Sequence, residues 1–212
     1  MLAAGYNPDQ MGDILVVILH QDTSHQQVKI NHGVVKIFDP DSQTTLGFNF
    51  LNASHVLPNL KGQDGQIHLS SDDLKHLNHQ IQRAGFSDQL QLDRDPKFVV
   101  GLVKSVKKHP DSDRLTITQT EIDRHQTVQI VSGSPNMRKG IKVVVAKIGA
   151  MMPNGMIIWP GSLKGVKSNG MICAGYELRI PGAPQHPGAL VLPDSYQVGE
   201  RFDFKQAANL FK

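Results

Sequence analysis

The chain lacks the residues that hold small secreted proteins together. Its 212 residues include a single cysteine, Cys173, which cannot form a disulfide within the chain. The longest uncharged apolar run near the start covers residues 14–19, far short of the roughly 20 residues that a membrane span needs. No Lys or Arg precedes that run, as a signal peptide would require. We therefore expect a cytoplasmic protein with no membrane partner.

Long helices and familiar catalytic motifs are also absent. Charged residues make up only 19% of the chain, and 19 glycines with 12 prolines divide it into short segments, which excludes a coiled coil and favours strands. The sequence has no GxSxG, Walker loop, GxGxxG or CxxC pattern. We expect a noncatalytic binding protein with no cofactor and no small-molecule substrate.

The net charge of +3 conceals two halves of opposite sign. Residues 1–96 hold 6 Lys and Arg against 11 Asp and Glu, a balance of 6 − 11 = −5; residues 97–212 hold 16 against 8, a balance of +8. Charge segregation on this scale predicts two domains, and the basic half is the candidate for binding a polyanion.

The acidic half is predicted to be an α+β domain over residues 1–86. Apolar strand-length runs occupy residues 14–19, 28–30 and 34–38, and Leu46, Phe48 and Phe50 alternate with polar or small residues, as expected for a strand. Leu74, Leu77, Ile81 and Ala84 recur at helical spacing between a Ser70 or Ser71 cap and Gly85. The Asp-rich stretch 87–96, which ends in Pro96, is interpreted as a linker.

Histidines are concentrated in the acidic half, which raises the possibility of a metal site. His76 and His79 share a helix face, and His20, His25 and His32 fall in adjoining segments. Zinc sites need three or four compactly spaced ligands, often with cysteine or an HExxH pattern, and neither is present. We expect these histidines to be exposed or hydrogen-bonded, with no metal.

The basic half is predicted to be all-β. Residues 98–106, 115–122, 128–131 and 143–148 are strand-like, and 156–159 and 189–192 resemble shorter strands. Short strands separated by glycine-rich turns predict a five-stranded barrel of the OB type over residues 97–203, followed by a C-terminal tail at 204–212.

Three blocks of this half resemble a known family. HPDSDRL at 109–115, IVSGSPNMRKG at 130–140 and LKGVKSNGMICAGYEL at 163–178 are similar to the signature blocks of the EMAP-type tRNA-binding domain, which also occurs in the bacterial phenylalanyl-tRNA synthetase beta chain. An acidic α+β domain followed by this module resembles the YtpR group of tRNA-binding proteins. Where relatives have V-C-G-A-P-N, this chain has Ser132 and Ser134 in place of the Cys and Ala. The resemblance implies an OB fold and a tRNA partner.

The blocks supply cations for phosphates, polar groups for base edges, and glycines that let backbone approach a ligand. The family's S-x-G-M and E-L elements correspond to Ser168, Gly170, Met171, Glu177 and Leu178. The candidate RNA-binding residues are Arg114, Asn136, Arg138, Lys139, Lys164, Lys167, Ser168, Asn169, Gly170, Met171 and Glu177. The alternative is that the first block is a plain turn, while Met171, Cys173 and Leu178 are core and the lysines a solvated rim.

Three functions remain open from the sequence. The first is a tRNA-binding protein, in which few aromatics favour phosphate contacts and RNA shape over stacking along a single strand. The second is an adaptor that forms a homodimer or docks on a translation factor. The third is an enzyme whose site lies in the histidine-rich first domain.

Overall fold

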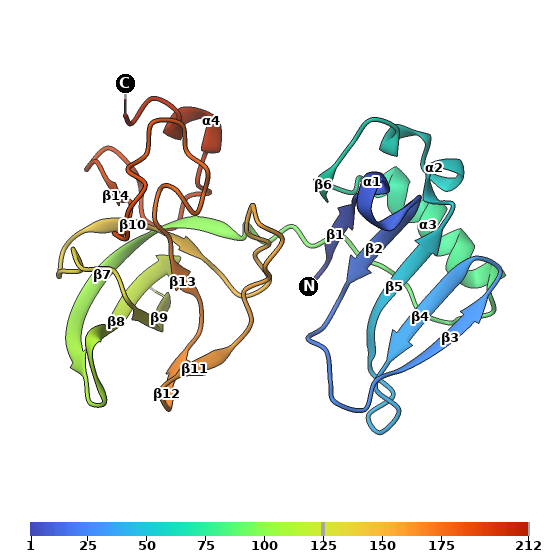
Figure 1. Ribbon diagram of the computed structural model, residues 1–212, viewed down its shortest axis with the longest axis horizontal. Helices are drawn as coiled ribbons and strands as arrows, with labels where there is room; N and C mark the ends of the chain where they lie inside the picture. The colour runs from blue at the N-terminus through green and yellow to red at the C-terminus, as the bar shows by residue number, and fades with distance from the viewer. Residues whose placement is uncertain (124–125, 212) are drawn as a thin grey trace. The chain divides into compact units, whose positions relative to one another are not determined.

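The structure, a computed structural model, describes residues 1–123 and 126–211. The chain divides into two compact units, Met1–Arg94 and Asp95–Lys212 (Figure 1). Among the described residues, no helix is both long and apolar enough to cross a membrane.

The first unit is a six-stranded antiparallel sheet with its longest helix packed on one face (Figure 1). The strand order is β3-β4-β5-β2-β1-β6. The strands are β1 (Ala3–Tyr6), β2 (Ile14–Ile18), β3 (Gln27–Asn31), β4 (Val34–Phe38), β5 (Thr45–Leu51) and β6 (Gly65–Ile67). The helices are α1 (Pro8–Met11), α2 (Ala53–Val56) and α3 (Ser71–Arg83), with a 3-10 turn at Pro58–Leu60.

Helix α3 starts at a capping box. The Ser70 hydroxyl accepts a hydrogen bond from the Asp73 backbone N–H, and the Asp73 carboxylate accepts one from the Ser70 N–H. Leu74, Leu77 and Ile81 lie on the buried face, in one core cluster with the inward residues of β2 and β5. The helix ends at Arg83 with Ala84 as its C-cap, and Gly85 follows with a φ of +76°, which favours glycine.

The stretch interpreted as a linker begins inside the first unit. Leu90 is 3% exposed, and its backbone N–H and carbonyl both bond the Asn78 amide, at 2.7 and 3.0 Å. Asp88 accepts hydrogen bonds from the Lys36 ammonium, at 2.6 Å, and from the Thr45 hydroxyl. Composition alone could not predict these contacts, because the partner residues lie on α3, β4 and β5.

The second unit is built around long β7, with strand order β13-β10-β7-β8-β9. Strand β14 also pairs with β10, and β11 and β12 form a separate hairpin. The bounds are β7 (Phe98–His109), β8 (Ser112–Asp123), β9 (Gln126–Ser132), β10 (Lys142–Ala146), β11 (Gly161–Leu163), β12 (Val166–Ser168), β13 (Met171–Ile172) and β14 (Val191–Leu192). A Cβ at Gly101 would lie 2.6 Å from the Val145 side chain, so β7 and β10 pack this closely only around a glycine.

Two expectations for this unit need correction. The order of the described strands is an open path, so a closed five-stranded barrel is not seen. Residues 156–159 form no strand: Ile157 makes only an isolated bridge to Met151. Gly155 and Pro160 flank the segment, and both disfavour extension of a ladder there.

The C-terminal residues pack on the second unit. Helix α4 (Phe204–Ala207) begins after an Asp203 cap, and the Phe204 ring lies 5.2 Å from the Phe98 ring and 5.1 Å from the Phe202 ring. Ala207 is fully buried. The segment expected to be a tail therefore covers part of the core.

Candidate nucleic-acid interface

The candidate residues gather around two hollows of the second unit. Ser168, Gly170, Met171 and Glu177 line a hollow of about 440 Å³ beside β9, β12 and β13. Arg114 and Lys164 line a shallower one of about 520 Å³ together with the turn at residues 110–113. The remaining candidates, Asn136, Arg138, Lys139, Lys167 and Asn169, are exposed on loops or on β12.

Ser168 is a buried structural link between strands. It is 5% exposed, its Oγ accepts a hydrogen bond from the Val131 backbone N–H at 3.0 Å, and it donates to the Gly170 carbonyl at 3.1 Å. The sequence predicts that this serine lies in a loop between Gly165 and Gly170 and that its hydroxyl binds the RNA. The structure instead uses the hydroxyl to hold β12 against β9.

Gly170 and Met171 hold the turn that follows Ser168. Gly170 has a φ of +143°, and a Cβ there would lie 3.1 Å from the Ala146 carbonyl, so a larger residue is strained. Met171 is half-buried and packs against the core cluster of the unit. Its packing agrees with the core alternative, while part of its side chain still faces the hollow.

Asn136 and Glu177 also bond backbone groups. The Asn136 side chain accepts from the Ala189 N–H at 2.8 Å and donates to the Ala189 carbonyl at 2.9 Å. Glu177 accepts from the Ala174 N–H at 2.7 Å through one carboxylate oxygen. These side chains fix the loops around the 440 Å³ hollow, and within the described residues the second Glu177 carboxylate oxygen accepts no hydrogen bond.

His109 connects the first block to the β11–β12 hairpin. It is 4% exposed, and its Nδ1 accepts a hydrogen bond from the Asp111 N–H at 3.0 Å. The ring proton must then sit on Nε2, which donates to the Leu163 carbonyl at 3.0 Å. Lys164 also reaches across, and its ammonium donates to the Asp111 carbonyl at 3.0 Å. The HPDSD turn is therefore a support for the hairpin that carries Lys164 and Lys167.

The cations of the second unit fall into two groups. Lys97 and Lys147 pair with Asp95, and Lys104 pairs with Glu121. Lys142 donates to the backbone carbonyls of Asp194 and Tyr196. These four stabilise the unit and are poor candidates for phosphate contacts.

The exposed cations include two that the sequence analysis missed. Lys107 and Lys108 lie on β7 just before the HPDSD turn, and within the described residues neither forms an ion pair. Their place directly before the first block was the available signal. Together with the candidates Arg114, Arg138, Lys139, Lys164 and Lys167, they form a set of seven cations in or directly before the three blocks, which we call the exposed cations below. Arg179, Arg201 and Lys205 are also exposed but lie outside the blocks.

Two aromatic residues of the 440 Å³ hollow were also missed as site residues. Trp159 and Tyr176 line it, and both are partly exposed. They come from separate segments, 157–161 and 174–177, which only the fold brings to one place. The signal in the sequence was the single tryptophan of the chain.

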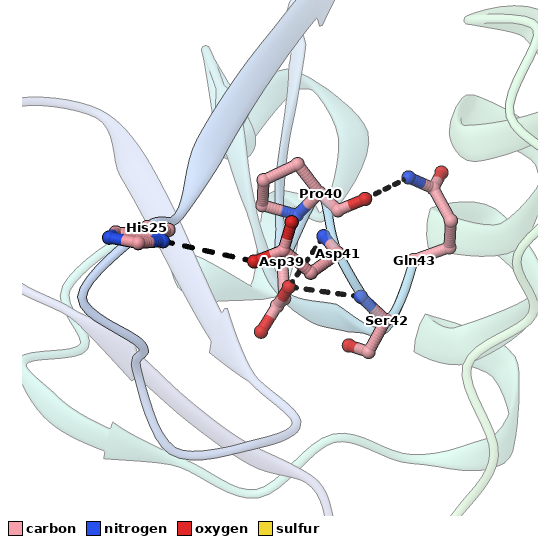
Figure 2. Close-up of polar contacts among 6 residues, drawn as sticks. All are labelled: His25, Asp39, Pro40, Asp41, Ser42 and Gln43. Carbon is pink, nitrogen blue, oxygen red and sulfur yellow. Dashed lines mark hydrogen bonds and ion pairs between the residues drawn. The ribbon is translucent and has the colours of Figure 1, made fainter.

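The histidine-rich first unit offers little for a metal. Figure 2 shows the turn after β4, where Asp39 Oδ1 accepts hydrogen bonds from the backbone N–H groups of Asp41 and Ser42. His25 Nδ1 lies 3.8 Å from Asp41 Oδ2, but these side chains are 75% and 83% exposed. Across residues 1–123 and 126–211, no three metal-ligating side chains are grouped suitably to hold an ion.

Comparisons with known proteins match both units. A family model described as "Domain of unknown function (DUF4479)" matches residues 21–93, and one described as "Putative tRNA binding domain" matches residues 98–201. The "Putative tRNA-binding protein YtpR" of Bacillus subtilis is 43% identical over 202 residues, which cover 95% of this chain and 99% of that protein. The chain belongs to the YtpR family.

Other relatives of this YtpR family member share one part of it. The phenylalanine–tRNA ligase beta subunit of Neisseria meningitidis is 40% identical over 134 residues, covering 62% of this chain but 16% of that protein. The corresponding Staphylococcus aureus subunit is 42% identical over 112 residues, covering 51% and 14%. A crystal structure of a MetRS related protein from Pyrococcus horikoshii aligns with 54% of this chain and 99% of that chain at 18% identity and a TM-score of 0.36, too weak a likeness for argument.

Proposed function

We propose that this protein is a noncatalytic tRNA-binding protein of the cytoplasm, and that its second unit binds the RNA. The observation that carries the proposal is the full-length match to a YtpR protein named for tRNA binding, together with the tRNA-binding family model over residues 98–201. The exposed cations lie within this matched region. Their charges supply the phosphate contacts that dominate RNA affinity.

We infer that the second unit is an OB-type fold in which contacts outside the strand ladder link strands of the open path. The Asn169 N–H donates to the Gln129 carbonyl at 2.9 Å, and the Gln129 side chain donates to the Lys167 carbonyl at 2.8 Å. With the hydrogen bond from the Val131 N–H to Ser168 Oγ, these contacts join β9 to β12 and to Asn169, which follows β12. We propose that the domains span residues 1–86 and 97–203, that most of the connecting segment 87–96 belongs to the first unit, and that the C-terminal segment belongs to the second.

A noncatalytic role also fits the one cysteine. Burial raises the pKa of the Cys173 thiol to about 12, so the thiolate needed by a nucleophile is scarce near neutral pH. Cys173 instead packs in the core of the second unit with Ala146 and Leu178.

The proposal is tested by measuring tRNA affinity against salt. We expect folded tRNA to bind more tightly than single-stranded DNA of equal length, with a log-log salt slope of about −3 to −5. Lys107→Gln, Arg138→Gln and Lys167→Gln should each make the slope shallower by about 1. Lys61→Gln is the matched control, because Lys61 is exposed on the acidic first unit. An affinity that ignores salt, or equal binding of the DNA, would refute the proposal.

A role as a protein-interaction adaptor is the second candidate, favoured by the first sheet. Val28 and Ile30 on edge strand β3 are 58% and 67% exposed and face the same side. The side of the sheet that they share holds Val35 and Ile37 of β4, which pair with them in register. If this face joins two copies of the chain, Ile30→Lys should lower the mass measured by light scattering. An identical mass for both proteins would exclude a homodimer through this face.

A further inference from the structure

The 440 Å³ hollow beside β9, β12 and β13 has a lining suited to a flat ring with polar edges. It lies where β9 ends, beside β12 and β13, and is closed by the segments 157–163, 174–177 and 187–188. Its volume of about 440 Å³ falls within the range of small-molecule sites, about 300–1,000 Å³. Trp159, Tyr176 and Met171 supply aromatic and polarizable surface.

Three polar groups of the hollow have no hydrogen-bond partner among the described residues. Within the described residues, the Trp159 indole N–H, the Tyr176 hydroxyl and the Ser134 hydroxyl make no hydrogen bond. Neither aromatic ring packs against another aromatic ring of the described residues. Buried or half-buried Trp and Tyr usually find a hydrogen-bond partner, so this arrangement fits a ligand that brings both a π-face and acceptors.

The negative charge of Glu177 indicates whether the hollow binds a base or a phosphate of the RNA. Glu177 lines the hollow, and among the described residues only one of its carboxylate oxygens accepts a hydrogen bond, from the Ala174 N–H. A free carboxylate oxygen repels a phosphate but accepts a hydrogen bond from a base N–H. One loop that lines the hollow, which includes Ser134, continues to the exposed cations Arg138 and Lys139, and Lys167 directly precedes the lining residue Ser168. Phosphates then lie outside the hollow and the base inside it.

We propose that the hollow binds one unpaired nucleobase of the RNA, with its face against Trp159 or Tyr176 and its N–H edge toward Glu177. This inference rests on the proposed function and names the part of the RNA that the site takes. A paired base has both its faces and its Watson–Crick edge occupied, so only an unstacked base of a loop or an end fits. The site reads one base, and the exposed cations hold the backbone around it.

The single tryptophan provides a direct test, because all intrinsic tryptophan fluorescence comes from Trp159. We expect tRNA to quench this signal saturably, and a fully paired RNA duplex of equal length to leave it unchanged while still binding. Free nucleoside monophosphates should quench it weakly and be displaced by tRNA. The RNA assignment would be overturned if mononucleotides quench Trp159 but tRNA neither quenches it nor displaces the bound mononucleotide. The hollow would then bind a free nucleotide.

Variants separate stacking from folding. Trp159→Leu should weaken tRNA binding about tenfold or more, because base–aromatic stacking is lost, whereas Trp159→Phe should retain most of the affinity. Glu177→Gln keeps an acceptor oxygen and serves as a second variant if Trp159→Leu lowers the melting temperature. Met156→Ala is the matched control, since Met156 is exposed on the neighbouring segment outside the lining.

The outcomes distinguish the two proposals. If the parent protein binds no tRNA, the proposed function fails. If tRNA binds in a salt-dependent way but neither quenches Trp159 nor responds to Trp159→Leu, the base site is wrong and the function stands. Equal quenching by the paired duplex would also overturn the assignment to an unpaired base.

Discussion

Replacing Ser168 with alanine removes the hydroxyl that joins β12 to β9. In the parent protein, the Val131 N–H donates to Ser168 Oγ at 3.0 Å, and both residues are buried. Alanine leaves that backbone N–H without this acceptor and the Gly170 carbonyl without the donor that Ser168 supplies. A buried donor that loses its acceptor costs about 1–3 kcal/mol. We expect Ser168→Ala to destabilise the second unit by that amount.

Thermal unfolding of the full chain, followed by calorimetry, measures this effect. For a unit of this size, a loss of about 2 kcal/mol lowers the midpoint of its transition by roughly 8 °C. Ser162→Ala is the matched control, because Ser162 lies on the partner strand of the same hairpin with an exposed side chain. We expect the control to melt within about 2 °C of the parent, as surface substitutions usually do.

The RNA affinity of the same variants completes the argument. Lys167→Ala should melt like the parent and bind tRNA more weakly, since its side chain is exposed. Ser168→Ala should lose affinity only together with stability. A Ser168→Ala protein that melts like the parent and still binds tRNA tenfold more weakly would refute the structural role and support direct contact with RNA.

Two further predictions concern the cores of the units. Burial alone would raise the pKa of Asp88, but hydrogen bonds from Lys36 and Thr45 outweigh it and hold the pKa below the ordinary 3.8. The ionised Asp88 carboxylate therefore contributes to stability above pH 3.8, and this contribution is lost as the pH falls through the lower pKa of the folded state. We expect Lys36→Met to lower the free energy of unfolding by about 1–3 kcal/mol at neutral pH and by much less near pH 2, as measured by urea titration. Burial raises the pKa of the Cys173 thiol to about 12. We therefore expect a thiol reagent at neutral pH to modify no cysteine in the native protein and one cysteine per chain in denaturant. Rapid modification of the native protein would contradict the burial of this thiol.

Local signals in the sequence were sufficient for the longer elements. The predicted helix began at a Ser70 or Ser71 cap and ended before Gly85, and α3 runs from Ser71 to Arg83 between those residues. Residues 14–19 were expected to form a strand, and β2 spans Ile14–Ile18. Caps, apolar spacing and β-branched runs act within a few residues of one another, so the chain displays them without its fold.

The short strands were missed because their stability comes from distant partners. Strand β1 contains two alanines and a glycine, all weak strand formers, and exists because Ala3–Tyr6 pairs with both β2 and β6. The β11–β12 hairpin depends on the His109 bond to Leu163, which joins residues 54 positions apart. Conversely, residues 156–159 had the composition of a strand but no neighbouring strand to pair with beyond one bridge.

The types of residue in the site could be predicted from the sequence, but the role of each residue could not. Exposed cations could be named from the sequence because Lys and Arg seldom lie buried unless they are paired. Whether a lysine is paired depends on the fold: Lys104 meets Glu121 across the β7–β8 ladder, whereas Lys107 and Lys108 remain exposed on the same strand. The hollow with Trp159 and Tyr176 could not be foreseen, since its walls come from segments spread over residues 131–188.

The small polar residues of the blocks and the cations beside them have separable physical roles. Ser168, Asn136 and Glu177 each bond a backbone N–H, so each fixes the position of a loop. Lys167 and Arg138, one and two residues away from Ser168 and Asn136, have exposed side chains that meet the solvent. A change in a loop-fixing residue alters affinity by moving the exposed residues, and it must therefore alter stability as well. A change in an exposed cation alters the electrostatic attraction alone, so its effect must fade as salt screens the charges, whereas the loss caused by a displaced loop persists at high salt.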